Sequence, residues 1–508
     1  MPENRKLIAK NTIFLYVRML LVMCVTLYTS RVILQTLGAS DYGVYSVVGG
    51  IVVMFSFLSG SLSGATSRFL AFDLGEGSFE QLKRTFSASL NIYLLIASII
   101  VVLGESVGLW LIPNKLTIPT SRIEAAYWVL HFSIITAFFS FSQYPYTAAL
   151  LAREDMSVYA YVGVYEAVSK LVIAFAITVS PIDKLIFYAF LMMLNQILIQ
   201  TFYRLYASHK YSECHFRLIR DRALYKRLLT YSGYDMLPSM GLVFQSQGVD
   251  LLLNMFFGPV ANAARAIANQ VNGVFNQVVI NVIQAARPQV IKDYAQRDTQ
   301  AMYALSFLVS KYTYLLVLAI AIPLFFEMDY IIRLWLGAAA PVQTSLYCRI
   351  ILIVALVGTF NYSLGMPMHA IGKLRSFSIV NSILYVLPLP VGYVMFRSGA
   401  PDYTVFVAVL CSTMLMVAST LYLLYRIERF EWKNYLVRVF FICAIITALS
   451  IVFPFLTHFL LPSGLLRLVV VLLGSELILG VLVWFVAMDS ALRLKILSLV
   501  ASKIGKTQ

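Results

Sequence analysis

Fourteen apolar stretches, each long enough to cross a lipid bilayer, constrain this chain more than any other feature of its sequence. A bilayer core needs about 20 mostly apolar residues per helix. The second, seventh and eighth stretches are the least apolar. We therefore predict an all-α polytopic membrane protein with about 14 transmembrane helices. The stretches lie at roughly 12–36, 42–66, 87–112, 124–151, 158–180, 185–207, 229–256, 260–286, 303–325, 343–371, 375–396, 403–425, 435–457 and 464–487.

The composition excludes a water-soluble or disordered chain. Hydrophobic residues make up 60% of the 508 positions and charged residues 12%, whereas soluble domains are about 45–50% apolar and about 25% charged. The formal net charge of +15 would fit a nucleic-acid-binding protein or a membrane protein. The positions of the basic residues decide between these two classes.

Lys and Arg concentrate on the cytoplasmic loops of membrane proteins. With the N-terminus inside and fourteen crossings, 26 of the 39 basic residues fall on cytoplasmic segments, 6 on outer segments and 7 within spans. A wrong number of crossings would scramble this partition. We therefore predict cytoplasmic N- and C-termini, and the basic excess needs no nucleic-acid partner.

The longest connection between spans divides the chain into segments. We predict an N-terminal six-helix bundle over 1–208, a basic cytoplasmic linker over 209–228 and a C-terminal six-helix bundle over 229–430. Residues 431–508 would hold two extra transmembrane helices and a tail that alternates apolar and basic residues. Such a tail is typical of an amphipathic helix on an anionic membrane surface, and a frayed polar end is the alternative.

Weak matches between the two halves indicate an internal repeat. A shift of 220 residues places Leu37-Gly38 on Phe257-Gly258 and Asp73 on Asp293. Because each half would contain six spans, both halves enter the membrane in the same sense. The sequence therefore predicts a parallel pseudo-repeat with its axis along the membrane normal, as in some transporters.

The eighth stretch carries polar side chains on one helical face. Asn262, Arg265, Asn269, Asn272 and Asn276 follow one another at spacings of 3, 4, 3 and 4, which is the helical period. Polar groups that face lipid without a partner cost several kcal/mol each. They would either line an aqueous cavity, which we favour, or join helices through polar contacts.

Basic residues at membrane depth indicate the charge of the cargo. Guanidinium groups bind phosphate and carboxylate through paired hydrogen bonds, so an anionic, hydroxyl-rich solute such as a sugar on a lipid phosphate fits better than a cationic drug. The alternative for each residue is a structural partner, either a carbonyl or an acid. The candidate cavity residues of this kind are Arg18, Arg31, Arg265, Lys311 and Arg349.

Two acidic residues are candidates for coupling transport to a proton or a sodium ion. Asp250 is the main anion near the basic set, and Glu166 lies in the fifth stretch. Lys170 stands four residues after Glu166, so mutual neutralisation on one helix is the favoured alternative for that pair.

Motifs for catalysis are absent from the sequence. It contains neither a G-x-x-x-x-G-K-[ST] phosphate loop nor an H-E-x-x-H pair, and its five His and five Cys lack ligand spacing. We predict no enzyme activity, no metal site and no cofactor. An integral-membrane polysaccharide polymerase or ligase is the enzyme alternative, but the predicted outer loops are short for one.

The first 80 residues resemble a known family. Lys10-Asn11, the first span and then LQTLGASDYGVYSVVGGI at 34–51 are similar to the Wzx-type polysaccharide flippases of the MATE-like MOP superfamily. The most specific part is the L-G-x-x-x-Y-G pattern of Leu37, Gly38, Tyr42 and Gly43. The stretch from Pro145 to Ala152 is also similar, and the fourteen spans extend the resemblance over the whole chain.

The resemblance implies a function and a location. The chain would move undecaprenyl-diphosphate-linked oligosaccharide repeat units across a bacterial inner membrane by alternating access, for the synthesis of O-antigen, capsule or exopolysaccharide. Its partners would be the lipid-linked substrate, membrane lipid, a proton or sodium counter-ion, and polysaccharide polymerase and chain-length proteins. A MATE-type drug or cation antiporter is the main rival, which would have twelve spans and an acidic cavity.

Overall fold

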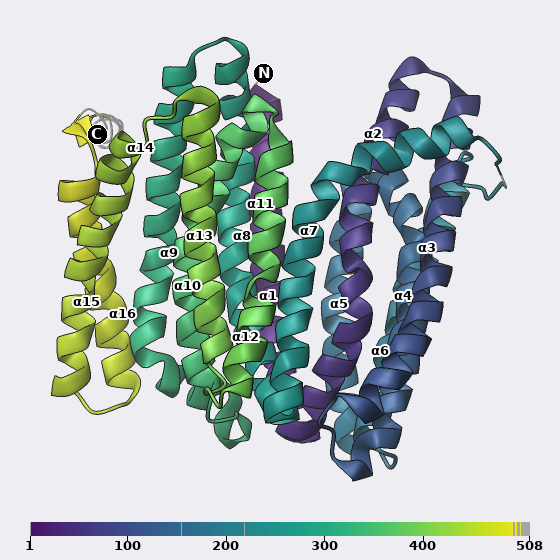
Figure 1. The fold of residues 1–508 in the computed structure, drawn as a ribbon, viewed down its shortest axis with the longest axis horizontal. Helices are drawn as coiled ribbons and strands as arrows, with labels where there is room; N and C mark the ends of the chain where they lie inside the picture. Colours follow the sequence, from purple (N-terminus) through teal and green to yellow (C-terminus); the bar gives the residue numbers. More distant parts are fainter. Residues whose placement is uncertain (1, 154, 218, 491–492, 495–497, 499–508) are drawn as a thin grey trace. The chain divides into compact units, whose positions relative to one another are not determined.

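A computed structural model shows a chain built of helices (Figure 1). It describes residues 2–153, 155–217, 219–490, 493–494 and 498, and every regular element among them is helical. The predicted amphipathic tail therefore lies largely outside the described residues. The all-helical fold class is confirmed.

The chain divides into two compact units. The first comprises Met1–Ala266, Trp335–Gln343 and Tyr385–Val405, and the second comprises Ile267–Leu334, Thr344–Leu384 and Phe406–Gln508. The division of the chain into two six-helix bundles at the 209–228 linker stays a prediction, because the two compact units are defined differently.

The first unit contains all of the described helices that end before residue 266. Its elements are α1 (Pro2–Val53), η1 (Met54–Ser56), α2 (Phe57–Glu76), α3 (Phe79–Asn114), η2 (Thr120–Arg122), α4 (Ile123–Ala152), α5 (Met156–Ala176), η3 (Ile177–Val179), α6 (Lys184–Lys210), α7 (Arg222–Phe257), the start of α8 (Pro259–Ala295), and, from later in the chain, η4 (Gly337–Ala339) and α12 (Pro388–Arg397).

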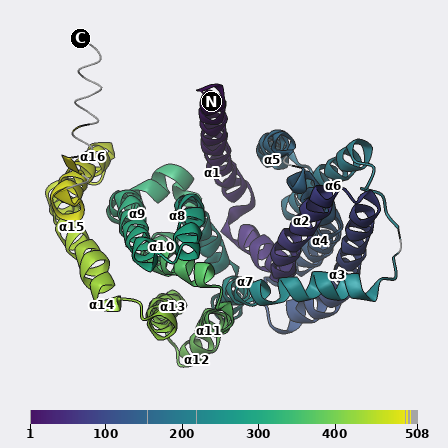
Figure 2. The ribbon, with the colours of Figure 1, turned by 90° about the horizontal axis from the view of Figure 1, so that it is seen from above.

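The second unit contains the rest of α8 and the C-terminal helices. They are α9 (Thr299–Leu336), α10 (Thr344–Ile371), α11 (Leu374–Val386), α13 (Thr404–Glu428), α14 (Trp432–Tyr435), η5 (Leu436–Phe441), α15 (Ile442–Leu460), α16 (Leu465–Leu482) and η6 (Val483–Ala487). Figure 2 shows α15 and α16 as neighbouring helices at the C-terminal end of this unit.

The helices agree with the predicted number of spans. Among the described residues, 11 helical stretches are long and apolar enough to cross a membrane. One of them, Val22–Glu76, includes both of the first two predicted spans, and α7 and α8 do not qualify. These are the stretches in which polar residues were expected to weaken the hydropathy signal. Dividing Val22–Glu76 at Gly38, where the backbone leaves the helical conformation, and adding α7 and α8 accounts for the fourteen.

The internal repeat is visible in the backbone. Gly38 has φ 78° and ψ 165°, and Gly258 has φ 78° and ψ −175°, so the two glycines interrupt their helices with nearly the same conformation. Gly77, after α2, and Arg297, after α8, also both have positive φ, 72° and 60°. Each of these pairs is separated by the predicted 220 residues.

The helices of the two repeats also begin at corresponding positions. α3 and α9 begin at Phe79 and Thr299, and α6 and α13 begin at Lys184 and Thr404, so each pair keeps the shift of 220. At the repeated aspartates, Asp73 accepts a hydrogen bond from Thr85 at 2.5 Å and Asp293 accepts one from Gln289 at 2.7 Å. Both carboxylates are buried. The repeat therefore preserves backbone turns and a hydrogen-bonding role as well as hydropathy.

Glycine is required at both glycine positions of the L-G-x-x-x-Y-G pattern, Gly38 and Gly43, for two different structural reasons. Gly38 adopts a positive φ, which costs a residue with a Cβ roughly 1–2 kcal/mol. At Gly43, a Cβ would lie 1.7 Å from the carbonyl oxygen of Pro259. Only glycine allows α1 to approach the start of α8 this closely. The pattern is thus explained by chain geometry.

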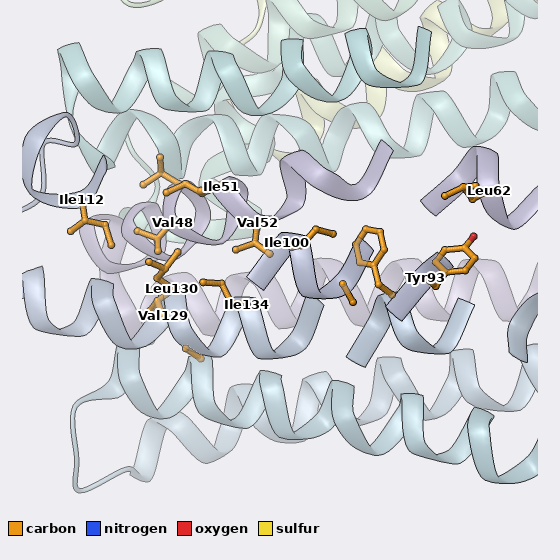
Figure 3. Close-up of a cluster of buried hydrophobic side chains, with 14 of the residues drawn as sticks. Val48, Ile51, Val52, Leu62, Tyr93, Ile100, Ile112, Val129, Leu130 and Ile134 are labelled. Atoms are coloured by element: carbon orange, nitrogen blue, oxygen red, sulfur yellow. The ribbon is translucent and has the colours of Figure 1, made fainter. Parts of the chain in front are cut away.

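Close helix packing forms the core of the first unit. Figure 3 shows Val48, Ile51 and Val52 of α1 in one apolar cluster with Leu130 and Ile134 of α4. At Gly104 and Gly108 of α3, an added Cβ would lie 3.0 Å from Ile134 and 2.7 Å from Leu130. Small residues thus bring α3 and α4 together, as is usual for helices packed in membranes.

The basic linker begins with a segment fixed to the first unit. Arg153 forms a 2.6 Å ion pair with Glu213, and Lys210 forms one of 2.6 Å with Asp155. Cys214 is buried in the adjoining cluster, and this burial raises the pKa of its thiol above the usual range. Cys214 is therefore a protonated packing residue.

Candidate functional site

The turn between α7 and α8 is held by a polar network within the first unit. Asn254 donates a hydrogen bond to Asn262 at 3.0 Å, and Asn262 donates one to the carbonyl oxygen of Asp250 at 2.7 Å. Arg265 contacts the Asp250 carboxylate at 2.6 Å and donates to the carbonyl oxygen of Ser246 at 2.6 Å. The first two members of the predicted polar face therefore join α8 to α7.

Arg265 and Asp250 form a buried ion pair, since only 7% of each side chain is exposed. Removing two charges from water is costly, and their mutual attraction offsets that cost only when their geometry and hydrogen bonds are good. The sequence predicted both residues as functional candidates. The structure brings them together and makes each the other's counter-ion.

The remaining asparagines of the α8 face differ from Asn262 in their exposure and in their hydrogen bonding. Asn269, Asn272 and Asn276 lie in the part of α8 that belongs to the second unit, and all three are partly exposed. Within the described part of the chain, none of them has a hydrogen-bond partner, whereas the neighbouring Gln277 donates to Asn281 at 3.0 Å. At 1.5 Å per residue, the three amides form a row about 10 Å long. This row can offer hydrogen-bond donors and acceptors to a polar ligand.

The polar stripe of the second predicted span is used differently. Ser59 donates to the carbonyl oxygen of Ser56 at 2.6 Å and accepts, through its own carbonyl, a hydrogen bond from Tyr93 at 3.3 Å. Thr66 donates to Ser89 at 3.4 Å, and both side chains are buried. These groups serve the packing of α2 on α3 within the first unit.

Two other predicted cavity cations bind carbonyl and carboxylate groups of the second unit. Lys311, on α9, is buried and donates to the carbonyl oxygen of Ala487 at 2.7 Å. Arg349, on α10, donates to the carbonyl oxygen of Phe325 at 2.9 Å and to Asp329 at 2.7 Å. Each of these two cations therefore has a partner within its own unit.

Arg31 and Arg18 are the remaining cations of the predicted set. Arg31 is partly exposed on α1 in the first unit. The side chain of Arg18 lies outside the described residues. The other coupling candidate, Glu166, pairs with Lys170 at 2.6 Å on α5, as the spacing of four predicts.

Sequence reasoning missed a buried ion pair between α9 and α16. Glu327 is fully buried, and Arg467 contacts its two carboxylate oxygens at 2.8 and 2.9 Å. The predicted ninth span ended at 325, so Glu327 fell outside it. Arg467 lies in the first turn of the stretch 464–487 and is one of the 6 basic residues assigned to outer segments, because residues in a helix's end turn are counted with the adjoining loop. The apolar residues that follow Glu327 were the signal that the helix continues, and α9 does extend to Leu336.

A second missed cluster joins three helices of the first unit. Arg122, at the start of α4, contacts Asp41 at 2.6 Å and also pairs with Asp183, the N-cap of α6. Asp41 follows the Gly38 interruption in α1. The three residues are 81 and 61 positions apart in sequence, so no local pattern could have predicted their contact.

An apolar cavity lies within the second unit. It has a volume of about 210 Å³ and is lined by residues of α9, α10 and α15, including Tyr314, Leu318, Phe325, Leu352, Leu356 and Ile451. Thr447 is the main polar group in the lining. Such a cavity fits a hydrocarbon segment better than a polar solute.

No family model and no curated protein match the sequence. Solved structures match the fold. The lipid II flippase MurJ, in an inward closed conformation, has a TM-score of 0.72 at 14% identity over 93% of this chain and 98% of that one. An inward-facing multidrug resistance MATE family transporter of the MOP superfamily has a TM-score of 0.66 at 13% identity over 78% and 92%.

A third match is a MOP superfamily transporter from Pyrococcus furiosus that has a binding pocket of reversed polarity. Its TM-score is 0.60 at 14% identity, over 80% of this chain and 93% of that one. At these identities the likeness shows the fold. The chain has the fold of the MOP superfamily transporters, and its long apolar helices make it a multi-pass membrane protein.

The extent of these matches differs in one useful respect. The match to MurJ leaves 7% of this chain uncovered, and these residues are fewer than those between Trp432 and the C-terminus. That match must therefore include part of the C-terminal helix pair. The share left outside the two transporter matches is large enough to omit the whole segment.

Proposed function

We propose that this chain is a flippase. It would move undecaprenyl-diphosphate-linked oligosaccharide repeat units across the bacterial inner membrane by alternating access, for surface polysaccharide synthesis. The observation that carries this proposal is the match to the lipid II flippase over 93% of the chain, which extends into the C-terminal pair. The resemblance of Leu37–Gly43 to the Wzx-type flippases supports the same class.

The row of amides on α8 supports a sugar headgroup as the cargo. Asn269, Asn272 and Asn276 each present a carbonyl acceptor and an NH₂ donor, and no described residue of the chain uses them. Sugar hydroxyls both donate and accept, so they match this chemistry. The row would contact the oligosaccharide, and its length of about 10 Å suits more than one sugar ring.

The Arg265–Asp250 ion pair supports a transport step in which Arg265 exchanges the Asp250 carboxylate for the diphosphate of the cargo. A diphosphate binds guanidinium through paired, charge-assisted hydrogen bonds, so it would compete with the Asp250 carboxylate for Arg265. Once released, Asp250 would take up a proton or a sodium ion. Arg349 and Asp329 offer a second pair of the same kind, and Arg18, Arg31 and Lys311 complete the proposed basic set.

The apolar cavity of the second unit supports a lipid-linked cargo. Its aliphatic and aromatic lining would take part of the polyprenyl chain while the headgroup crosses.

The test is complementation of a strain that makes a surface polysaccharide and lacks its own flippase. We expect the triple variant Asn269→Leu, Asn272→Leu and Asn276→Leu to lose at least about tenfold in polymer at equal expression, because three hydrogen-bonding groups are removed and tenfold is ~1.4 kcal/mol. The matched control is Asn114→Leu, an exposed asparagine whose amide donates to its own helix at 2.8 Å. It should complement fully.

Two further outcomes distinguish the rival functions. Incubation of the purified protein with labelled lipid-linked oligosaccharide should leave the mass of the label unchanged, whereas a polymerase or ligase would raise it. Resistance to cationic drugs together with a failure to complement would favour the antiporter. Full complementation by the triple variant would refute the proposed role of the α8 row.

A further inference from the structure

The last transmembrane helix exposes a regular face that nothing in the described chain covers. Nine positions of α16 are exposed, and five of them follow the spacings 3, 4, 3 and 4, which is the period of a seam along which two helices pack side by side. Four of these five positions are apolar or glycine, and the fourth along the helix is acidic. The positions, defined here as the α16 seam, are Leu466, Val469, Leu473, Glu476 and Gly480.

Glu476 occupies an unusual position for a carboxyl group. It is the central residue of the Leu465–Ala487 span, so it lies about 16 Å from either end. Ionisable side chains at this depth are costly and normally have a partner. Other acids on the spans have one, since Glu105 contacts His131 at 2.9 Å and Glu327 pairs with Arg467. Within the described residues, Glu476 has none and is exposed.

Gly480 is the second, independent observation. A Cβ added at Gly474, on the same helix, would lie 2.1 Å from the ring of Phe453 on α15, so that glycine is required by packing within the chain. A Cβ added at Gly480 would meet nothing within 4 Å. A glycine in a helix interior costs about 1 kcal/mol relative to alanine. Gly480 is therefore unexplained by the chain itself, and small residues typically mark sites where membrane helices approach closely.

We propose that the α16 seam is the contact between two copies of this chain, with the Glu476 carboxyl groups hydrogen-bonded to each other across a two-fold axis. Two copies inserted in the same sense are related by an axis along the membrane normal. Every residue on that axis then meets its own counterpart at the same depth. A carboxylic acid carries one donor and spare acceptor capacity, so two of them satisfy each other without a cation.

The positions of the charged residues favour a hydrogen bond between the two Glu476 carboxyl groups over an ion pair between the two copies. The other exposed charges of the described Trp432–Leu460 and Leu465–Ala487 spans are Lys433 on α14 and Arg438 on η5, both before the start of α15. They lie near the opposite end of that span from the loop that leads into α16, far from the depth of Glu476. Gly480, one turn from Glu476, would let the two backbones approach. The proposal concerns the oligomer and does not depend on the transported substrate.

The first test is disulfide crosslinking in native membranes. Cys24 and Cys411, the exposed cysteines, are first replaced by Ser. Single cysteines are then introduced by Leu473→Cys on the seam and, as a control, by Val102→Cys on the exposed face of α3. We expect oxidation to give covalent dimers at position 473 and only background dimers at position 102. Equal crosslinking at both positions would overturn the proposal.

The second test measures dimerisation in liposomes by single-molecule photobleaching at several protein-to-lipid ratios. We expect Glu476→Leu to weaken dimerisation about tenfold, because the interhelical hydrogen bonds are lost, and Glu476→Gln to preserve most of it. Gly480→Leu should also weaken it, through steric separation of the helices. Because the seam is exposed, thermal unfolding of the monomers should be unchanged, and Glu476→Gln keeps the test valid if the leucine variant does not fold.

Three results would refute the two-copy seam. They are a monomer at every ratio, dimers of the Glu476→Leu variant as strong as those of the unmodified chain, and a monomeric chain that binds another membrane protein through Glu476. Loss of dimers with full complementation would leave the flippase proposal intact. Failed complementation with intact dimers would contradict that proposal alone.

Discussion

The α1–α2 and α7–α8 stretches are equivalent segments of the repeat, yet their polar faces have different uses. Both turn at a glycine with φ 78° and end at a residue with positive φ. In the first stretch, Ser59 donates to Ser56 of η1 and Thr66 donates to Ser89 of α3. In the second, Asn262 and Arg265 hold the turn, whereas Asn269, Asn272 and Asn276 remain without partners among the described residues. Backbone geometry is thus shared by the repeats, whereas their polar side chains differ in whether the described residues supply them with partners.

The largest expected effect concerns the ion pair that is present only in the second stretch. Arg265→Ala would leave the Asp250 carboxylate buried without a cation, which costs about 3–5 kcal/mol. We expect a marked fall in the thermal unfolding temperature of the purified protein, measured by tryptophan fluorescence in detergent. The double variant Arg265→Leu and Asp250→Leu should recover much of that loss. Equal loss in the single and double variants would contradict a mutual counter-ion role.

A slightly smaller loss is expected at Gly43, where the first stretch meets the second. Gly43→Ala places a methyl group against the Pro259 carbonyl, and overpacking of this kind costs roughly 3 kcal/mol. Gly64→Ala is the matched control because its Cβ would meet nothing within 4 Å. Folded yield by fluorescence-detected size-exclusion chromatography should fall only for the first variant.

The two repeat glycines test the equivalence of the turns directly. Gly38→Ala and Gly258→Ala should each destabilise the protein by about 1–2 kcal/mol, because alanine disfavours positive φ. Chemical unfolding of each variant would measure this. Effects that differ by more than about 1 kcal/mol would show that one turn carries constraints that the other lacks.

The smallest effect is expected on the polar stripe of α2. Ser59→Ala removes a hydrogen bond within one helix, so stability should change by less than about 1 kcal/mol and complementation should be retained. The contrast with the triple asparagine variant of α8 separates structural from functional polar faces. Loss of complementation in Ser59→Ala would place ligand chemistry in both repeats.

Hydropathy, charge and helical spacing were sufficient to predict the fold. They predicted the fourteen spans, the 220-residue repeat and the Glu166–Lys170 pair, since each depends on local patterns. Arg265 and Asp250 were recognised as unusual, but their contact was not predicted because spacing along the chain does not report which helices touch. Glu327 was missed because the span was ended too early, and the Arg122 cluster because its partners are distant in sequence.

The Glu327–Arg467 pair has a consequence for the order in which the protein is made. The two residues are 140 positions apart, and translation proceeds at about 5–20 residues per second. Glu327 therefore enters the insertion machinery many seconds before its cation is synthesised. During that interval the Glu327 carboxylate needs a proton, water or a chaperoning contact. Its cation becomes available only when α15 and α16 are inserted. Helix α16, which is made late, thus supplies the counter-ion of α9.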